Sequence, residues 1–264
     1  TPFTHILTVP RRQTEDAHEL YEEEVVNLKL CLERFFEAGI TDKALYNAIG
    51  VYNETRRLLK ELYQLRKSDT PPISGAETME VLNAMSKVPR EQFNEILGRL
   101  VDEVGRVNRA VEGKFRLMIV GSPLNNIEFI RTIEDLGGLV VTDELCTGAR
   151  YFWDLVETAP DQNPIQAISR RYLNNQPCAR MVPSESRWNA ILDMVEDFRV
   201  QGVVSEIIRH CVVYAHDQPL LAEKLANKGI PLLHLDLEYG TSGTGQIMTR
   251  VQAFIEMLEA RTEK

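Results

Sequence analysis

The stretch Gly202-Val-Val-Ser-Glu-Ile-Ile208, followed directly by Arg209-His210-Cys211, decides the fold class of this chain. Its mostly apolar, β-branched residues are typical of a strand buried in a parallel sheet. Beyond a polar turn, Pro219 to Lys228 has a helical pattern that Gly229 ends, and Ile230 to Leu237 predicts the next strand. We therefore expect a strand–helix–strand unit with Cys211 just beyond the carboxyl end of its first strand. Open parallel sheets bind their ligands at that edge.

A glycine-rich loop, Gly240-Thr-Ser-Gly-Thr-Gly245, follows this unit and leads into a final amphipathic helix over Gln246–Glu259. The free N–H groups at such a strand-to-helix loop could hold an anion, so Gly240, Gly243 and Gly245 are candidate cofactor-binding residues. The spacing is not the dinucleotide fingerprint, and no Walker lysine accompanies it. A plain connection between strand and helix is the alternative interpretation.

Upstream, the hydrophobic period changes at Gly113. Residues 13–111 have helical periodicity almost throughout, whereas residues 114–120 and 139–142 predict strands, each followed by a turn and a helix. We therefore predict a helical segment over residues 1–112 and an α/β domain over residues 113–264. The fold class is α/β, with an open, mainly parallel sheet of four strands in a Rossmann- or flavodoxin-like three-layer arrangement.

Three further expectations concern individual segments. Thr4–Val9 reads as a strand without a local partner, which suggests the cut edge of a preceding domain and a chain that is a piece of a longer protein. Within the predicted helix over residues 42–67, Glu54, Arg56, Arg57 and Lys60 are expected on the solvated face. The aromatic run Tyr151-Phe152-Trp153 is either a wall of the site or ordinary core.

Composition excludes some function classes. The 264 residues carry 30 Lys and Arg against 39 Asp and Glu, a formal net charge of -9, and no basic patch is evident. Nucleic-acid binding is therefore not expected. No apolar run approaches the ~18 residues of a membrane span, and the start at Thr1 shows no signal peptide. We expect a cytoplasmic protein.

Four cysteines are present, at Cys31, Cys146, Cys178 and Cys211, and none forms a CxxC pair. A local zinc or ferredoxin-type motif is therefore excluded. Cys31 is expected to be an ordinary helix core residue. Cys146 falls just after the strand over residues 139–142, as Cys211 does after its own strand. The two would meet only if the fold brings both strand ends to one edge.

Several stretches recur in one order in a known family. They are Tyr52-Asn-Glu-Thr-Arg56, Leu62-Tyr-Gln-Leu-Arg66, Pro71-Pro-Ile-Ser-Gly75, Asp143-Glu-Leu-Cys-Thr-Gly-Ala-Arg-Tyr-Phe152, Arg171-Tyr-Leu with Pro177-Cys178, the strand ending at Cys211, Leu235-Asp-Leu-Glu-Tyr239, and Thr249-Arg-Val-Gln-Ala-Phe-Ile-Glu-Met-Leu258. Together they resemble subunits of the benzoyl-CoA reductase and 2-hydroxyacyl-CoA dehydratase family, which includes 2-hydroxyglutaryl-CoA dehydratase. The resemblance spans nearly the whole chain.

The resemblance implies an iron–sulfur enzyme of anaerobic metabolism that acts on an acyl-CoA thioester. Family members use a [4Fe–4S] cluster held by cysteines of each subunit, a second homologous subunit, and an ATP-dependent activator protein that injects one electron. The implied chemistry is low-potential electron transfer that forms a substrate radical. Reduction of a benzoyl-CoA type substrate, dehydration of a 2-hydroxyacyl-CoA, and a cluster-free, non-catalytic homologue all stay open.

Residue roles carry over from the family only at matching positions. Cys211 fits the cysteine after the late strand, although His210-Cys-Val-Val departs from the usual Phe-Cys-Asp-Pro. Cys146 fits a frequent position, so Cys211 and Cys146 are the predicted metal ligands, whereas Cys178 matches a loop cysteine not expected to be a ligand. The other ligands belong to an amino-terminal domain that the chain lacks, so residues missing from it, or the partner, would complete the cluster. No catalytic residue is assigned.

Overall fold

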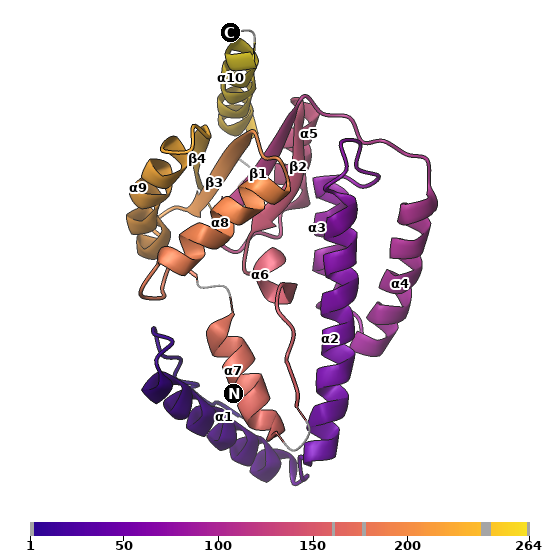
Figure 1. Ribbon diagram of the computed structural model, residues 1–264, viewed down its shortest axis with the longest axis vertical. Helices are drawn as coiled ribbons and strands as arrows, with labels where there is room; N and C mark the ends of the chain where they lie inside the picture. Colours follow the sequence, from indigo (N-terminus) through magenta and orange to yellow (C-terminus); the bar gives the residue numbers. More distant parts are fainter. Residues whose placement is uncertain (1–2, 160–161, 176–177, 239–243, 263–264) are drawn as a thin grey trace.

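The computed structural model describes residues 3–159, 162–175, 178–238 and 244–262 (Figure 1). The strands are β1 (Phe115–Gly121), β2 (Gly138–Glu144), β3 (Gly202–Ile208) and β4 (Leu232–Leu237). The helices are α1 (Glu15–Phe36), α2 (Asp42–Leu65), α3 (Gly75–Ala84), α4 (Arg90–Arg106), α5 (Ile127–Asp135), α6 (Ala149–Phe152), α7 (Pro164–Asn174), α8 (Glu185–Asp197), α9 (Val212–Ala226) and α10 (Thr244–Thr262).

The four strands form one sheet in the order β2-β1-β3-β4, and every pairing is parallel. This confirms the predicted open parallel sheet that follows a helical amino-terminal segment. β1 is entirely buried except at Arg116, and β3 is buried up to its last residue, Ile208. Such continuous burial explains why both strands are mostly apolar in the sequence.

Side chains of successive strand residues alternate between the two faces of the sheet, so they belong to two separate hydrophobic cores. Met118, Val120 and Val203 lie in a core with α2, α4, α6, α8 and α9, whereas Leu117 and Val204 lie in a second core with α3, α5 and α10. Figure 1 shows α8 crossing in front of the strands and α9 beside β4, whereas α5 and α10 lie toward the upper end of the sheet. Helices therefore cover both faces, as the three-layer prediction requires.

The order of the strands fixes where the sheet can bind a ligand. The connection from β1 through α5 leads to β2 on one side, whereas the connection from β3 through α9 leads to β4 on the other. The chain therefore diverges from the adjacent carboxyl ends of β1 and β3. In open α/β sheets, this switch point forms the crevice in which ligands bind.

Two helices in the first part of the chain begin at residues whose side chains cap the helix amino terminus. Thr41 accepts a hydrogen bond from the backbone N–H of Ala44, and Ser74 forms a reciprocal capping box with Glu77. Each cap satisfies N–H groups that an uncapped first turn would leave free. The carboxylate of Glu134 on α5 also accepts the N–H groups of Gly75 and Ala76, which ties α3 to the sheet layer.

Four sequence expectations were wrong in detail. Thr4–Val9 is not a strand; it runs as irregular chain beside α1, where the N–H of Thr8 donates to Glu24. α4 ends at Arg106 rather than at Val111, and α9 begins at Val212 with Pro219 inside it. The solvated-face assignment failed at Arg56, which is only 1% exposed.

Among the residues that the structure describes, no helix combines the length and apolar character needed to cross a membrane. The division of the chain at residue 113 into two domains stays a prediction. The core that contains α2 and α4 also contains residues of β1 and β2, so these helices pack directly on the sheet.

Candidate functional site at the carboxyl edge of the sheet

The turn after β3 places Cys211 at the switch point. The N–H of Cys211 donates to the carbonyl of Ile208 at 2.9 Å, and Cys211 is the N-cap residue of α9. His210 has φ of 69°, a left-handed conformation that is unfavourable for a side chain other than glycine and tightens this turn. Ser122, just after β1, accepts the N–H of Ile208 at 3.0 Å and holds the two strand ends together. Cys211 is half-buried at this edge.

The turn after β2 is built around the buried carboxylate of Asp143. One oxygen accepts the N–H of Leu145 at 3.1 Å and the N–H of Ala149 at 2.9 Å, and the other accepts the hydroxyl of Tyr63. A Cβ at Gly148 would lie 1.9 Å from the same carboxylate. Only glycine fits there, so the loop that exposes Cys146 has a fixed course.

Arg150 joins the two turns. Its Nη2 lies 2.7 Å from the Sγ of Cys146 and 3.0 Å from the hydroxyl of Tyr214, which is on the first turn of α9 after Cys211. The guanidinium is 3% exposed and also lies 3.3 Å from a carboxylate oxygen of Glu144. A buried guanidinium against a sulfur can balance the negative charge of a thiolate ligand.

Glu144, which contacts Arg150, belongs to a buried network of ion pairs. Arg187 on α8 binds Glu144 through two nitrogens, at 3.1 and 3.3 Å, and binds Asp217 on α9 at 2.6 Å. Burial lowers the pKa of Arg187, but Glu144 and Asp217 outweigh it and raise the pKa above its ordinary value. Arg187 therefore stays positively charged. The ion network attaches α8 and α9 to the end of β2.

Glu206 in β3 is a second titratable group at this edge. It is 1% exposed, and its Oε1 has no hydrogen-bond partner among the described residues. Burial, and then the charge of Cys211, raises the pKa of Glu206 to about 9. The side chain is therefore an uncharged acid near neutral pH and can hold a proton beside the candidate thiolate.

The candidate ligands thus lie on one edge, but they do not form a complete metal site. Among the described residues, no group of three or more His, Cys, Asp and Glu side chains is arranged to hold a metal ion. A [4Fe–4S] cluster takes four ligands, usually cysteines. Cys146 and Cys211 supply at most two of them, with Arg150 as counter-charge. These residues fit one part of a cluster site and leave the rest to groups outside the described chain.

The other predicted site residues are placed elsewhere or are not described. Gly240 and Gly243 lie outside the described residues, and Gly245 is the second residue of α10. Cys178 is half-buried and accepts the N–H of Arg180. Cys31 lies on α1 against Arg34, half-buried rather than in the core.

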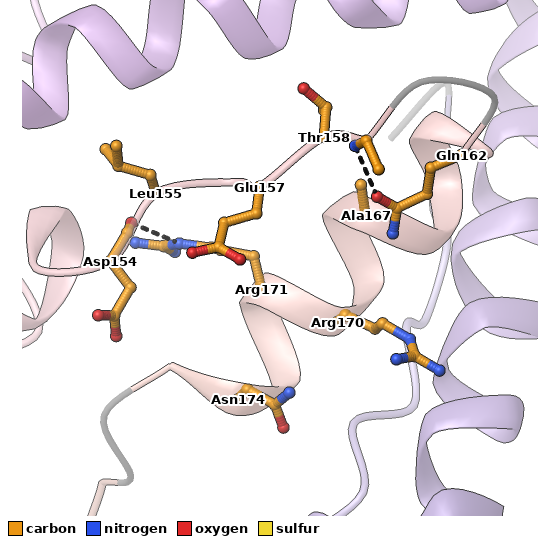
Figure 2. A pocket seen from close by; sticks show the side chains of 10 residues that line it. Asp154, Leu155, Glu157, Thr158, Gln162, Ala167, Arg170, Arg171 and Asn174 are labelled. Atoms are coloured by element: carbon orange, nitrogen blue, oxygen red, sulfur yellow. Dashed lines mark hydrogen bonds between the residues drawn. The ribbon is translucent and has the colours of Figure 1, made fainter.

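The aromatic run after Cys146 divides between core and surface. Phe152 is fully buried, with its ring 4.7 Å from that of Tyr63, so its core interpretation is confirmed. Trp153 is half-buried and lines a pocket of about 400 Å³ with residues of α8. A larger pocket of about 540 Å³ lies between α7 and the segment before it, lined by Asp154, Glu157 and Arg171 among others (Figure 2).

The sequence shows Arg150 four residues after Cys146 but gives no sign of the groups that position it. Arg209, two residues before Cys211, is exposed and paired with Glu238. Glu144, Arg187 and Asp217 carried no signal, because ionic partners that are far apart in the chain have no fixed spacing. Glu206 did carry a signal, since a carboxylate inside an apolar strand must be paired or uncharged.

Comparison with known proteins places the chain in a family. Residues 1–258 match the family model described as 2-hydroxyglutaryl-CoA dehydratase, D-component. A protein of Escherichia coli strain K12 named as a dehydratase subunit is 30% identical over 262 residues, which cover 96% of this chain and 68% of that protein. The (R)-phenyllactyl-CoA dehydratase beta subunit of Clostridium sporogenes is 21% identical, with 96% and 67% covered.

A third relative is named for a different reaction. One of the benzoyl-CoA reductase subunits of Thauera aromatica is 26% identical over 240 residues, which cover 88% of this chain and 61% of the relative. The chain therefore spans between 61% and 68% of the length of these relatives.

Proposed function

The chain belongs to the 2-hydroxyglutaryl-CoA dehydratase D-component family, and we propose that it is a subunit, or part of one, of an iron–sulfur enzyme that acts on an acyl-CoA thioester by low-potential, one-electron reduction. The observation that carries this proposal is the joining of Cys146 to the first turn of α9, directly after Cys211, through the single guanidinium of Arg150. Both cysteines follow strands at the ligand-binding edge of the sheet.

In this proposal Cys146 and Cys211 are ligands of a [4Fe–4S] cluster whose remaining ligands lie outside these 264 residues or on a partner. Such a cluster supplies single electrons at a potential tuned by burial, charge and hydrogen bonds to sulfur. Arg150 donates to one of these sulfurs, and Glu206 keeps an uncharged acid beside the other. The charge of Arg150 reduces the net negative charge around the thiolates and the uncharged Glu206 adds none, which together favour the more reduced state of a bound cluster.

The proposed partners are a second homologous subunit and an ATP-dependent activator protein. The relatives are named as subunits of dehydratases and of a reductase, so each works within an assembly of more than one chain. The substrate is an acyl-CoA. Residues 240–245 remain candidates for binding an anionic part of it on the ground of their sequence, because a glycine-rich stretch between a predicted strand and a predicted helix offers free N–H groups.

Two reactions are compatible with this site, and the relatives' names now favour one of them. Both the 30% identical protein and the phenyllactyl-CoA enzyme are dehydratases by name, whereas one relative belongs to a benzoyl-CoA reductase. Loss of water from a 2-hydroxyacyl-CoA is therefore the leading candidate, and reduction of a benzoyl-CoA type substrate is the second. Anaerobic incubation of the assembled enzyme with each substrate class, followed by mass analysis of the product, separates the two.

The cluster assignment is tested by iron content. We expect the full gene product, purified without oxygen together with its partner, to be brown and to contain iron and sulfide. Cys211→Ala should abolish iron binding, and Cys146→Ala should lower it, while circular dichroism shows an unchanged fold. Cys31→Ala is the matched control, because Cys31 lies on α1 and touches only Arg34 among the polar groups described.

Iron that is unchanged in both Cys211→Ala and Cys146→Ala would remove these cysteines from the cluster. A colourless, iron-free wild-type complex would instead support the cluster-free homologue. Iron loss in Cys31→Ala equal to that in Cys211→Ala would point to a general folding effect and would contradict the assignment.

A further inference from the structure

A cluster of arginines and tyrosines surrounds Tyr151 of α6, the residue that follows Arg150. We call it the Arg–Tyr cluster, and its members come from α2, α4, α6 and α7: Tyr52, Arg56, Arg90, Tyr151, Arg171 and Tyr172. The proposed function above makes no use of these residues.

Arg56 is the innermost member. It is 1% exposed, and it donates to Asn53 at 3.0 Å and to the hydroxyl of Tyr172 at 3.2 Å. Its Nε is buried without a partner among the described residues. The guanidinium also lies 5.9 Å from the ring centroids of Tyr151 and Tyr172. A buried cation with a free donor has lost its water and gained no anion in return, which is costly.

Arg90 lies at the first position of α4 and is still less well paired. Its Nε and Nη1 are both buried and find no partner in the described part of the chain, and its guanidinium stacks 4.8 Å from the ring centroid of Tyr52. A positive side chain is unfavourable at a helix amino terminus, because the helix dipole already makes that end positive. An anion bound beside Arg90 would offset both the side-chain charge and the dipole.

Arg171 adds a third positive charge. It is 6% exposed, its guanidinium lies 4.7 Å from the ring centroid of Tyr172, and its donors go to the carbonyls of Asp154 and Tyr151. Burial lowers the pKa of Arg171, and the charge of Arg56 lowers it further. The cluster therefore concentrates like charges that repel one another.

No carboxylate of the described residues forms an ion pair with Arg56, Arg90 or Arg171. Nine other arginines of the chain are paired in this way. The hydroxyl of Tyr151, whose ring is near the guanidinium groups of both Arg56 and Arg90, is also buried and lacks a partner among these residues. Several donors, with no paired negative charge, thus converge at one place.

The cluster reaches the surface. Tyr52 and Tyr172 are 39% and 44% exposed. Arg171 also lines the 540 Å³ pocket, where Figure 2 shows its guanidinium beside Asp154 and Glu157 while Arg170 is directed away. Solvent therefore reaches the rings of Tyr52 and Tyr172 and, through the pocket, the side chain of Arg171. The exposed aromatic rings offer flat surfaces on which a planar base can stack.

We propose that the Arg–Tyr cluster binds the 3′-phosphorylated adenosine end of the CoA thioester, with the phosphate at Arg90 and Arg56. This inference rests on the proposed function, because the acyl-CoA substrate comes from there. Guanidinium groups pair with phosphate through two parallel hydrogen bonds, which suits unpartnered arginine donors. The two sites adjoin, since Arg150 and Tyr151 are consecutive residues of α6 that contact the cysteine turn and the cluster respectively. The long pantetheine arm of CoA can pass between them.

Calorimetric titration with CoA and with dephospho-CoA, which lacks only the 3′-phosphate, tests the proposal directly. We expect CoA to bind the purified protein at least about tenfold more tightly than dephospho-CoA. Arg90→Gln should weaken CoA binding by about tenfold and leave dephospho-CoA binding nearly unchanged, and Arg90→Lys should restore part of the difference. Arg99→Gln, on the exposed face of the same helix, is the matched control and should change neither affinity.

The other outcomes each overturn the assignment. Equal affinity for CoA and dephospho-CoA, or a ratio unchanged in Arg90→Gln, shows that the cluster does not bind the 3′-phosphate. ATP that binds as tightly as CoA and loses its affinity in Arg90→Gln assigns the cluster to a nucleotide of another source. Absence of any CoA binding also rejects the proposal. Because iron content is measured separately, an iron-free protein that passes this titration would contradict the proposed function alone.

Loss of folding is a separate question with its own measurement. The buried nitrogens Nε and Nη1 of Arg90 bond to none of the described residues, so Arg90→Gln loses only the stacking of the guanidinium on rings such as that of Tyr52 and should lower the melting temperature only modestly. A variant that is unfolded in circular dichroism would show that Arg90 supports the fold and would overturn its assignment as a ligand-binding residue.

Discussion

Gly121 lies where β1 and β3 approach too closely for a side chain. It has φ of 140°, and a Cβ there would lie 1.8 Å from the carbonyl oxygen of Glu206. That close approach lets Ser122 reach across to the end of β3 and fix the turn of Cys211. The residue shapes the candidate site without touching a ligand.

We predict that Gly121→Ala destabilises the protein by at least about 3 kcal/mol, because both the backbone conformation and the adjacent strand must change. Thermal unfolding measures the effect. Gly50→Ala is the control: Gly50 lies inside α2 with no atom within 4 Å of the added Cβ, and alanine there should stabilise by up to about 1 kcal/mol. Equal melting temperatures for the two variants would show that the strands separate easily.

Glu206 makes the stability of the metal-free protein depend on pH. The pKa of Glu206 is raised to about 9 by burial and by Cys211, whereas the unfolded chain has the ordinary value near 4.5. Between these values the folded state holds a proton that the unfolded state has lost. The contribution of Glu206 is therefore fully present below about pH 4.5 and is lost as pH rises toward 9.

We predict that Glu206→Gln removes this dependence. The free energy of unfolding of the variant, relative to wild type, should rise with pH by up to about 1.4 kcal/mol per unit over that range. Chemical denaturation at about pH 6, 7 and 8 measures the difference. A difference that is constant with pH would show that Glu206 is ionised in the folded protein.

Residue-level burial was only partly predictable. Apolar positions of β1 and β3 followed from the sequence because both faces of a parallel strand are buried. Arg56 did not, because helical periodicity places it beside Arg57 and Lys60 and cannot show that Tyr151 and Tyr172 from other helices cover it. Burial of a charged side chain is decided by segments far away in the chain.

At the scale of elements, α8 and α9 are attached to the sheet by charge as well as by apolar contact. Trp188 and Leu221 pack in the core, and Arg187 ties Glu144 at the end of β2 to Asp217 on α9. Because the ions are buried, removal of one leaves the others without compensation.

We predict that Arg187→Met destabilises the protein by about 3–5 kcal/mol, since Asp217 loses its ion partner and Glu144 keeps only Arg150. Arg131→Met is the control, because the ion pairs of Arg131 with Glu80 and Glu128 are exposed and worth about 1 kcal/mol at most. Urea unfolding of both variants gives the comparison. Similar losses would mean that the buried network contributes no more than a surface pair.

Element boundaries were predictable where local chemistry decides them. The limits of β3, Gly202 to Ile208, followed from the sequence. The helical pattern predicted a start at Pro219, whereas α9 begins at Val212 and Pro219 lies inside it. The strand expected at Thr4–Val9 failed because a β-rich pattern forms a strand only where a free sheet edge is in reach.

At the scale of the whole molecule, two surfaces compete as the place where a partner subunit docks. The carboxyl edge exposes the turns of Cys146 and Cys211, which a cluster and a thioester would need to have shielded from water. The face of α1 exposes large apolar side chains, among them Phe36 at 67% and Leu30 at 46%.

We predict that the partner covers the carboxyl edge. In hydrogen exchange with the copurified complex, peptides over residues 145–153 and 209–214 should be protected relative to the isolated chain, and peptides of α5 should not. Trp153→Ala should weaken association more than it lowers the melting temperature, because Trp153 is half-buried and follows the Cys146 turn closely in the chain. Protection confined to α1, or a lower melting temperature with normal association, would reject this interface.

The strand order also has a consequence for how the chain acquires its structure. β1 finds β2 after a single short helix, but its other neighbour, β3, pairs Gly202 with Leu117 across a long intervening stretch of helices. During synthesis, β1 therefore leaves the ribosome well before β3 does, with one row of backbone N–H and C=O groups unpaired and apolar side chains on both faces. Such non-local pairing slows folding. β1, a central strand of the finished sheet, is thus an exposed and aggregation-prone edge strand until β3 has been synthesised. Chaperones that bind exposed strands therefore have the longest time to act on β1.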